Sequence, residues 1–277
     1  MRPPSLSQTL AACRARGQTA LVAYVVAGDP SLGATEKYVS ALAQAGADII
    51  ELGVPFSDPL ADGPVNQRAS ERALRAGTTL RGVLECVRRL RDSGLQTPLV
   101  LFTYLNPVLQ MGLGKFAIQA REVGVTGVLV VDMPPEEAAE YQRHLAANEL
   151  ETVFLAAPTT PTGRLRSIAA ATTGFVYYVS RTGVTGVQAA LSDTLLSELE
   201  TLRGQIDKPV VVGFGIASPE HARELAPFAD GVVVGSALVQ CIARSATPEE
   251  AVGPLTELVA SIKAALPPRA VDAASPP

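Results

Sequence analysis

Tryptophan is absent from this chain of 277 residues, and histidine and cysteine occur only two and three times. The odd number and wide spacing of the cysteines argue against a disulfide framework and a C-x-x-C metal motif, and favour a reducing cytoplasm. The histidines have no acidic or thiol cluster at ligand spacing, so we expect no metal site and interpret each as a surface residue of a helix. The residues concerned are Cys13, Cys86, Cys241, His144 and His221.

Positive charge and long hydrophobic runs are also scarce. Lys and Arg number 23 against 27 Asp and Glu, a net charge of −4, whereas nucleic-acid binding requires clustered basic residues. The arginines within 68–75 and 88–91 follow helical spacing and are predicted to lie on solvated faces. No apolar run approaches the ~18 residues of a membrane helix, and the N-terminus lacks the apolar core of a secretion signal. We therefore expect neither a nucleic-acid nor a membrane partner.

Short apolar runs alternate with segments of helical period along most of the chain, a pattern typical of βα units around a parallel sheet. Eight such units in roughly 250 residues predict a single (β/α)8 TIM barrel, with an extra N-terminal helix and an active site at the C-terminal ends of the strands. An open doubly wound sheet is the alternative, and the lack of a dinucleotide glycine fingerprint argues against it. The predicted strands are Ala20–Ala27, Asp48–Gly53, Leu99–Tyr104, Gly127–Asp132, Glu151–Ala156, Phe175–Ser180, Pro209–Phe214 and Gly231–Val234.

Residues 1–266 are expected to form this one catalytic domain, and the Pro- and Ala-rich residues 267–277 a disordered tail. Two connections, residues 54–66 and 181–191, are longer than a βα link requires. Long loops in a compact domain are commonly functional or disordered.

A single carboxylate interrupts the second predicted strand. Glu51 stands in the run Ile49-Ile50-Glu51-Leu52-Gly53, and the adjoining strands carry no Lys or Arg. A salt-bridged core glutamate is the structural alternative. Burial should instead raise the pKa of Glu51 toward neutrality, which suits a group that gives and takes protons near pH 7.

The loop after this strand, residues 55–64, carries two further carboxylates, Asp58 and Asp62. Three prolines stiffen the loop, and Gly63 is a candidate for a positive φ. Aspartates in such loops commonly cap turns. At the same barrel mouth as Glu51, however, one of them is a candidate second catalytic carboxylate.

Glycine clusters follow the last three predicted strands. They are Thr182-Gly183-Val184-Thr185-Gly186, Gly213-Phe214-Gly215 and Gly235-Ser236. Tight turns are one explanation. Backbone N–H groups of such loops, with a helix N-terminus, also form the usual phosphate site of these barrels. We therefore predict phosphate binding without a basic patch.

These motifs resemble the tryptophan synthase α chain family. The run Glu51-Leu52-Gly53-Val54-Pro55-Phe56-Ser57-Asp58-Pro59-Leu60-Ala61-Asp62-Gly63-Pro64 resembles the family signature over its whole length. The resemblance covers about residues 6–265. Further matching segments are residues 27–30, 104–107, 132–137, 177–186 and 213–216.

The resemblance implies a lyase of the aldolase type that splits indole-3-glycerol phosphate into indole and glyceraldehyde 3-phosphate, with no metal or organic cofactor. It implies that Glu51 is the general acid/base, that Asp62 contacts the indole N–H, and that Tyr177 lines the site near Glu51. The resemblance assigns loop closure over Asp62 to Thr185, and phosphate binding to Gly186, Gly215, Gly235 and Ser236.

The resemblance also implies a partner, the tryptophan synthase beta subunit, in an α2β2 assembly. The Pro-rich loop from Val54 to Pro64 and the Asn106-Pro107 segment are stiff, apolar candidates for the docking surface. The departures are small, since some members carry Phe in place of Tyr24 and Thr in place of Val26.

Two rival functions remain at this stage. Another phosphate-binding barrel, such as an indole-glycerol phosphate synthase or a sugar-phosphate isomerase, would typically carry a catalytic lysine or cysteine, and neither stands at the end of a predicted strand. A non-catalytic regulatory barrel would have lost its carboxylates, whereas Glu51 and Asp62 are both present.

Overall fold

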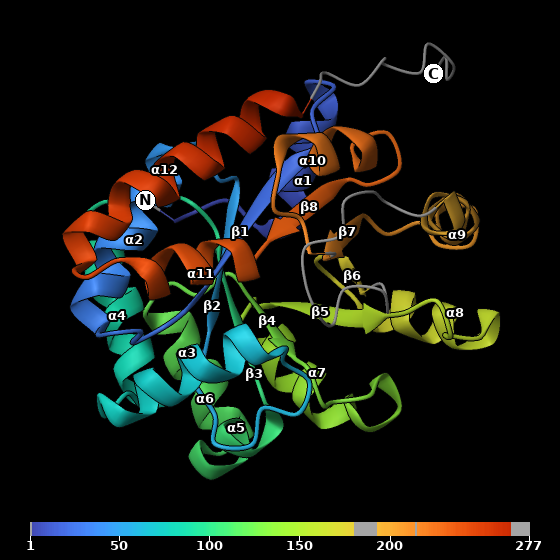
Figure 1. The fold of residues 1–277 in the computed structure, drawn as a ribbon. Coiled ribbons are helices and arrows are strands. Elements are labelled where there is room, and N and C mark those ends of the chain that lie inside the picture. Colours follow the sequence, from blue (N-terminus) through green and yellow to red (C-terminus); the bar gives the residue numbers. More distant parts are fainter. Residues whose placement is uncertain (1, 180–192, 214, 267–277) are drawn as a thin grey trace.

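The computed structural model describes residues 2–179, 193–213 and 215–266. Eight parallel strands close into a barrel in chain order, and helices surround it (Figure 1). The predicted TIM barrel is confirmed, and each strand lies within two residues of its expected ends. The strands are β1 (Ala20–Val26), β2 (Ile49–Gly53), β3 (Leu99–Thr103), β4 (Gly127–Val130), β5 (Glu151–Ala156), β6 (Val176–Val179), β7 (Val210–Gly213) and β8 (Gly231–Val234).

Most helices begin at side-chain or proline signals in the sequence. Ser5, Ser31, Thr79, Ser218 and Thr247 each cap a helix by accepting a hydrogen bond from a backbone N–H of its first turn. The helices are α1 (Leu6–Ala15), α2 (Leu32–Gln44), α3 (Pro64–Arg75), α4 (Leu80–Asp92), α5 (Leu105–Met111), α6 (Leu113–Glu122), the 3₁₀ helix η1 (Pro135–Glu137), α7 (Ala139–Ala147), α8 (Thr162–Ala171), α9 (Asp193–Arg203), α10 (Pro219–Leu225), α11 (Ser236–Arg244) and α12 (Pro248–Ala265).

Strand residues alternate between two hydrophobic cores. Successive side chains of a strand point to opposite faces, here the barrel interior and the helix layer. Ile49 belongs to the interior cluster, whereas Ile50 and Leu52 pack in the outer one. Glu51 therefore points inward with Ile49, although every residue of β2 is buried.

The N-terminal end of the barrel is closed by α1. Leu6 and Leu10 join the interior cluster, and the carboxylate of Glu151, at the start of β5, accepts hydrogen bonds from the backbone N–H groups of Leu6 and Ser7. The Leu6 side chain lies against Gly127 at the start of β4, where a Cβ atom would come within 2.5 Å of it. Access to the interior is therefore left to the opposite end.

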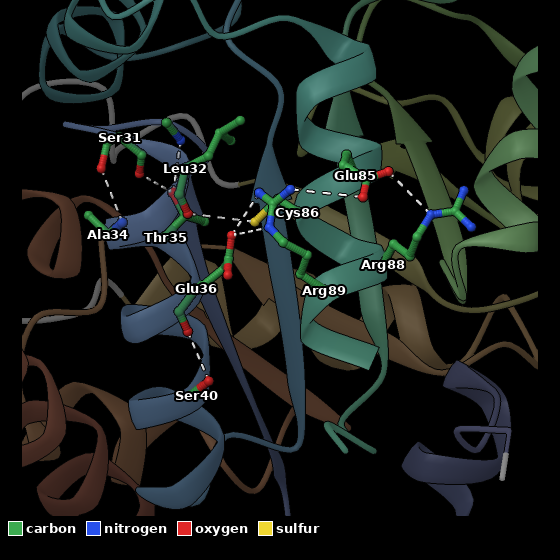
Figure 2. A network of polar contacts seen from close by, with 11 residues as sticks. Ser31, Leu32, Ala34, Thr35, Glu36, Ser40, Glu85, Cys86, Arg88 and Arg89 are labelled. Atoms are coloured by element: carbon green, nitrogen blue, oxygen red, sulfur yellow. Dashed lines mark hydrogen bonds and ion pairs between the residues drawn. The ribbon is translucent and has the colours of Figure 1, made fainter. Parts of the chain in front are cut away.

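An ion-pair network joins α2 to α4 on the outside of the barrel (Figure 2). Arg89 of α4 contacts Glu36 of α2 at 2.7 Å, and Arg88 and Arg89 both reach Glu85. These exposed arginines agree with the predicted solvated face. Arg91 does not, because its half-buried guanidinium donates hydrogen bonds to three backbone carbonyl groups.

Three other sequence interpretations are wrong. Arg72 of α3 turns inward to form a two-point ion pair with buried Asp29, at 2.8 and 2.7 Å. His221 is 7% exposed, because it shares the inward face of α10 with Ala222 and Leu225. Gly63 has a φ of −73° and precedes α3, so the long loop ends there rather than at residue 66.

Some expectations fall outside the described residues, namely the connection 181–191, with Thr185 and Gly186, and the tail 267–277. Among the helices that are described, none is both long and apolar enough to cross a membrane.

Candidate active site

A cavity of about 690 Å³ lies at the C-terminal ends of the strands. Asp62, Tyr177, Gly215, Gly235 and Ser236 all line it. These residues lie in or after four different strands, so the barrel brings together groups that are up to 174 positions apart in the chain.

Glu51 lies beside this cavity within the barrel interior. The residue is 0% exposed, and neither carboxyl oxygen has a hydrogen-bond partner among the residues that the structure describes. Burial raises its pKa from 4.5 to about 8. The salt-bridge alternative is therefore wrong, and the expected desolvated glutamate is confirmed. At neutral pH such a group is largely protonated and can act as an acid.

Aromatic rings line the part of the cavity that adjoins Glu51. Tyr24 pairs with Glu51 in the β1–β2 register and, like Tyr177, lines the cavity. The Phe102 ring lies 5.3 Å from that of Tyr24 and 6.5 Å from that of Tyr177. Burial, followed by the charges of Glu51 and Asp62, raises the pKa of both tyrosines well above 10, so both keep their hydroxyl protons.

Two glycines make room for these tyrosines. A Cβ atom at Gly53 would lie 2.4 Å from the Tyr24 hydroxyl, and one at Gly213 would lie 2.3 Å from the Tyr177 ring. Gly213 therefore allows the Tyr177 ring to pack closely against the backbone. The sequence had predicted instead that the cluster Gly213-Phe214-Gly215 binds phosphate. Val26, the other noted departure, lies in the interior cluster.

Asp62 is held at the cavity by a residue that sequence reasoning missed. The Tyr104 hydroxyl donates to Asp62 Oδ2 at 2.9 Å and accepts from the backbone N–H of Ala61 at 3.0 Å. Burial raises the pKa of Asp62, and hydrogen bonds from Tyr104 and Asn66 oppose that rise. The sequence feature that could have indicated Tyr104 is its position at the end of the third predicted strand. Asp58, the other candidate, is exposed and accepts from Ser57.

Three of the predicted phosphate residues are described, and all three line the cavity. Gly235 is the N-cap of this nine-residue helix and Ser236 its first residue. Gly215 has a φ of 41°, and apart from its chain neighbours no described residue has an atom within 4 Å of a Cβ built on it. Arg164 is the one basic residue among the described residues of the lining, and Glu136 pairs with it at 3.4 Å. Backbone amides are thus the donors available to an anion near α11.

In the part of the chain that the structure describes, no group of three or more His, Cys, Asp or Glu side chains is placed to hold a metal ion. The cavity instead combines two carboxyl groups of different environment with an amide-rich helix N-terminus. That combination can perform general acid–base chemistry on an anionic ligand.

The sequence model of the family described as "Tryptophan synthase alpha chain" matches residues 10–267. The chain belongs to this family. Its relatives include the tryptophan synthase alpha chains of Citrifermentans bemidjiense, 52% identical over 85% of this chain and 88% of the relative, and of Chromobacterium violaceum, 52% identical over 90% and 95%.

Solved structures agree with the family assignment. Tryptophan synthase subunit alpha from Legionella pneumophila superposes with a TM-score of 0.86 at 38% identity, over 94% of this chain and 97% of that one. A chain of Mycobacterium tuberculosis tryptophan synthase gives 0.85 at 34% identity, over 95% and 99%. The tryptophan synthase alpha family is one of carbon–carbon lyases that cleave indole-3-glycerol phosphate, and this chain is such a lyase. The rival phosphate-binding barrels are thereby excluded.

Proposed function

We propose that the cavity binds indole-3-glycerol phosphate with the indole at Asp62 and the phosphate at the start of α11, and that Glu51 moves the protons of the cleavage. The observation that carries this proposal is the pairing of a fully buried, unpartnered Glu51 with a second, hydrogen-bonded carboxylate at one cavity. Two carboxyl groups in such different environments hold different protonation states at one pH.

The chemistry uses both states. Protonated Glu51 donates its proton to indole C3, which becomes tetrahedral while positive charge develops on the ring nitrogen. Ionised Asp62 accepts the indole N–H and stabilises that charge. The Glu51 carboxylate then takes the proton of the adjacent glycerol hydroxyl. The carbon–carbon bond breaks, its electron pair returns to the indole ring, and an aldehyde is left on the glycerol phosphate.

Among the described residues near the start of α11, backbone groups rather than a cationic side chain would bind the phosphate. The N–H groups of Gly235 and Ser236 and the partial positive charge of the α11 N-terminus supply the attraction, and Gly215 lines the same cavity. Thr185 and Gly186, for which the resemblance implies loop closure and phosphate contact, complete the proposed site.

The partner of the chain is a tryptophan synthase beta subunit, and we propose that it docks at the mouth of the barrel in an α2β2 assembly. Two large apolar side chains support this location. Leu60, in the loop before Asp62, is 92% exposed, and Leu109 of α5, after β3, is 52% exposed. Removal of apolar surface from water is favourable, so a partner that covers these two leucines would gain binding free energy.

The remaining proposals concern the domain boundaries and the cellular location of the chain. We propose that residues 1–266 act as one catalytic domain, with residues 267–277 as a tail. Three unpaired cysteines support a cytoplasmic location.

Release of indole from indole-3-glycerol phosphate tests the proposal. We expect Glu51→Gln and Asp62→Asn to lower kcat by roughly 10²-fold or more, as loss of general acid–base or electrostatic catalysis typically does. Both changes are nearly isosteric, so circular dichroism and binding of inorganic phosphate should match the wild type. Turnover above roughly a tenth of wild type in Glu51→Gln would rule out its role.

A further inference from the structure

Tyr104 contacts the loop that carries Asp62 at three points. Its ring packs against that of Phe56, with the ring centroids 5.0 Å apart. Its hydroxyl accepts a hydrogen bond from the backbone N–H of Ala61 at 3.0 Å and donates one to Asp62 Oδ2 at 2.9 Å. Tyr104 is 4% exposed and directly follows β3, so the loop is fastened to the barrel itself.

The direction of both hydroxyl bonds follows from the chemistry of the groups. A backbone N–H can only donate, so the Tyr104 oxygen accepts from Ala61, and the single phenolic proton is left for Asp62. Burial, followed by the charge of Asp62, raises the pKa of Tyr104 above its ordinary value, so the proton stays on the phenol. The Asp62 carboxylate therefore faces a donor, which favours its ionised form.

The turn of the loop is held without this hydroxyl. The side-chain amide of Gln67 donates to the carbonyl oxygens of Asp62 and Pro59, at 2.9 and 3.3 Å. The backbone N–H of Asp62 donates to the same Pro59 carbonyl group at 3.0 Å. A phenylalanine in place of Tyr104 would also keep the ring contact with Phe56. The hydroxyl thus adds only its contacts with the Ala61 N–H and with the Asp62 carboxylate.

We propose that Tyr104 is a positioning residue for Asp62, whose carboxylate it holds ionised and oriented toward the indole N–H of the substrate. The inference rests on the role proposed above for Asp62. A hydrogen bond to one carboxyl oxygen, Oδ2, restricts rotation of the whole group. The lining of the cavity includes Asp62 but not Tyr104, so Tyr104 acts from behind the carboxylate and does not touch the substrate.

The position of Asp62 explains why such a donor is needed. Burial favours the neutral acid, which could not stabilise positive charge on the indole nitrogen. Burial accordingly raises the pKa of Asp62, and the hydrogen bond from Tyr104 opposes that rise. Without the hydroxyl, a higher pH is required to ionise Asp62. Because the proposed mechanism uses the ionised form, the acid limb of activity should move to higher pH.

Three substitutions separate this role from a structural one. Tyr104→Phe removes the hydroxyl and keeps the ring. Phe56→Leu does the opposite, because it removes the ring contact and keeps the hydroxyl. Tyr178→Phe is the matched control, since the buried Tyr178 hydroxyl donates the same kind of bond, at 2.9 Å, to Oε2 of Glu198. Neither Tyr178 nor Glu198 is among the cavity-lining residues.

The assay uses the full chain with a beta subunit and follows glyceraldehyde 3-phosphate release between pH 5 and 9. We expect the acid limb of kcat/KM to move to higher pH by about one pH unit in Tyr104→Phe. kcat at pH 7 should fall roughly tenfold, with KM changed less than about twofold, because the proposed phosphate contacts are untouched. The substrate phosphate titrates near pH ~6 in every variant, so differences between variants report on the enzyme.

Urea unfolding of the same proteins supplies the second readout. We expect Tyr104→Phe to unfold near the midpoint of Tyr178→Phe, and both Tyr178→Phe and Phe56→Leu to keep the acid limb at its wild-type pH. An unmoved acid limb in Tyr104→Phe would overturn the inference. An equal shift in Phe56→Leu would do the same, since it would trace the effect to packing of the loop. Asp62→Asn, measured alongside, distinguishes the two proposals: undiminished turnover in that variant would remove the role of Asp62 itself.

Discussion

At the scale of the residue, the isolation of the Glu51 carboxyl group affects stability as well as chemistry. Its pKa is about 8 in the folded chain, against 4.5 for an ordinary glutamate. Between these values the folded state binds a proton that the unfolded chain releases, so stability falls as pH rises through this window. The loss is about 5 kcal/mol at most, since one pKa unit corresponds to about 1.4 kcal/mol.

Glu51→Gln should remove this pH dependence. The amide does not titrate, so the variant should gain stability relative to wild type between pH 5 and pH 9, by several kcal/mol. Burial of the glutamine amide in the variant also costs free energy, but this cost does not vary with pH. The informative quantity is therefore how the difference in unfolding free energy between the two proteins changes with pH. Urea unfolding at pH 5, 7 and 9 measures it. Parallel stability curves for the two proteins would contradict the raised pKa of Glu51.

The residue scale also shows what sequence reasoning can reach. Glu51 was predictable because its aliphatic neighbours and the lack of a nearby cation are local facts. Tyr104 was not assigned a role, because its contacts with Asp62 and Ala61 depend on how the loop folds back against β3. Likewise His221 was misplaced, since a helix of seven residues gives too little periodicity to indicate its buried face.

At the scale of the element, strands and caps were the most predictable features. The strands are buried on both faces and bounded by Gly, Pro or Asp, and Ser-Pro and Thr-Pro pairs begin α10 and α12. The direction of arginine side chains was less predictable. Arg72 and Arg91 reach partners from other segments, Asp29 and Gly124, which helical spacing alone does not indicate.

The N-terminus of α11 supplies the next prediction. Gly235→Asp should weaken binding of the substrate and of glycerol phosphate by roughly tenfold or more, because the new anion lies in front of the amide donors. The φ of Gly235 is −122° and a Cβ there would meet Tyr24 at an ordinary 3.5 Å, so folding should survive.

Equilibrium binding of glycerol phosphate and of indole separates the two ends of the substrate. Gly253→Asp is the control, since Gly253 of α12 faces open space and lies outside the cavity lining. A Gly235 variant that lost indole affinity alone would show that the phosphate lies elsewhere.

At the scale of the whole molecule, the two ends of the barrel have different tasks. Helix α1 fills the N-terminal end with Leu6 and Leu10, whereas the opposite end holds the cavity and the exposed Leu60. A partner that covers Leu60 would therefore lie directly over the loop that positions Asp62. In the proposed docking geometry, binding of the partner would be coupled to catalysis, as lid closure is in other enzymes.

The isolated chain should accordingly be a monomer with feeble lyase activity, and addition of a beta subunit should raise kcat substantially by ordering the loop around Asp62.

Leu60→Asp should weaken the complex at least about tenfold, because it buries a charge at the centre of the proposed contact. Ile118→Asp, at a half-exposed position in the middle of α6, should leave the complex intact. Size-exclusion chromatography and indole release, each with and without the beta subunit, measure both effects. Full activity in the isolated chain with no complex formed would instead identify a free-standing indole-releasing lyase. An unweakened Leu60 complex would move the docking surface away from this loop.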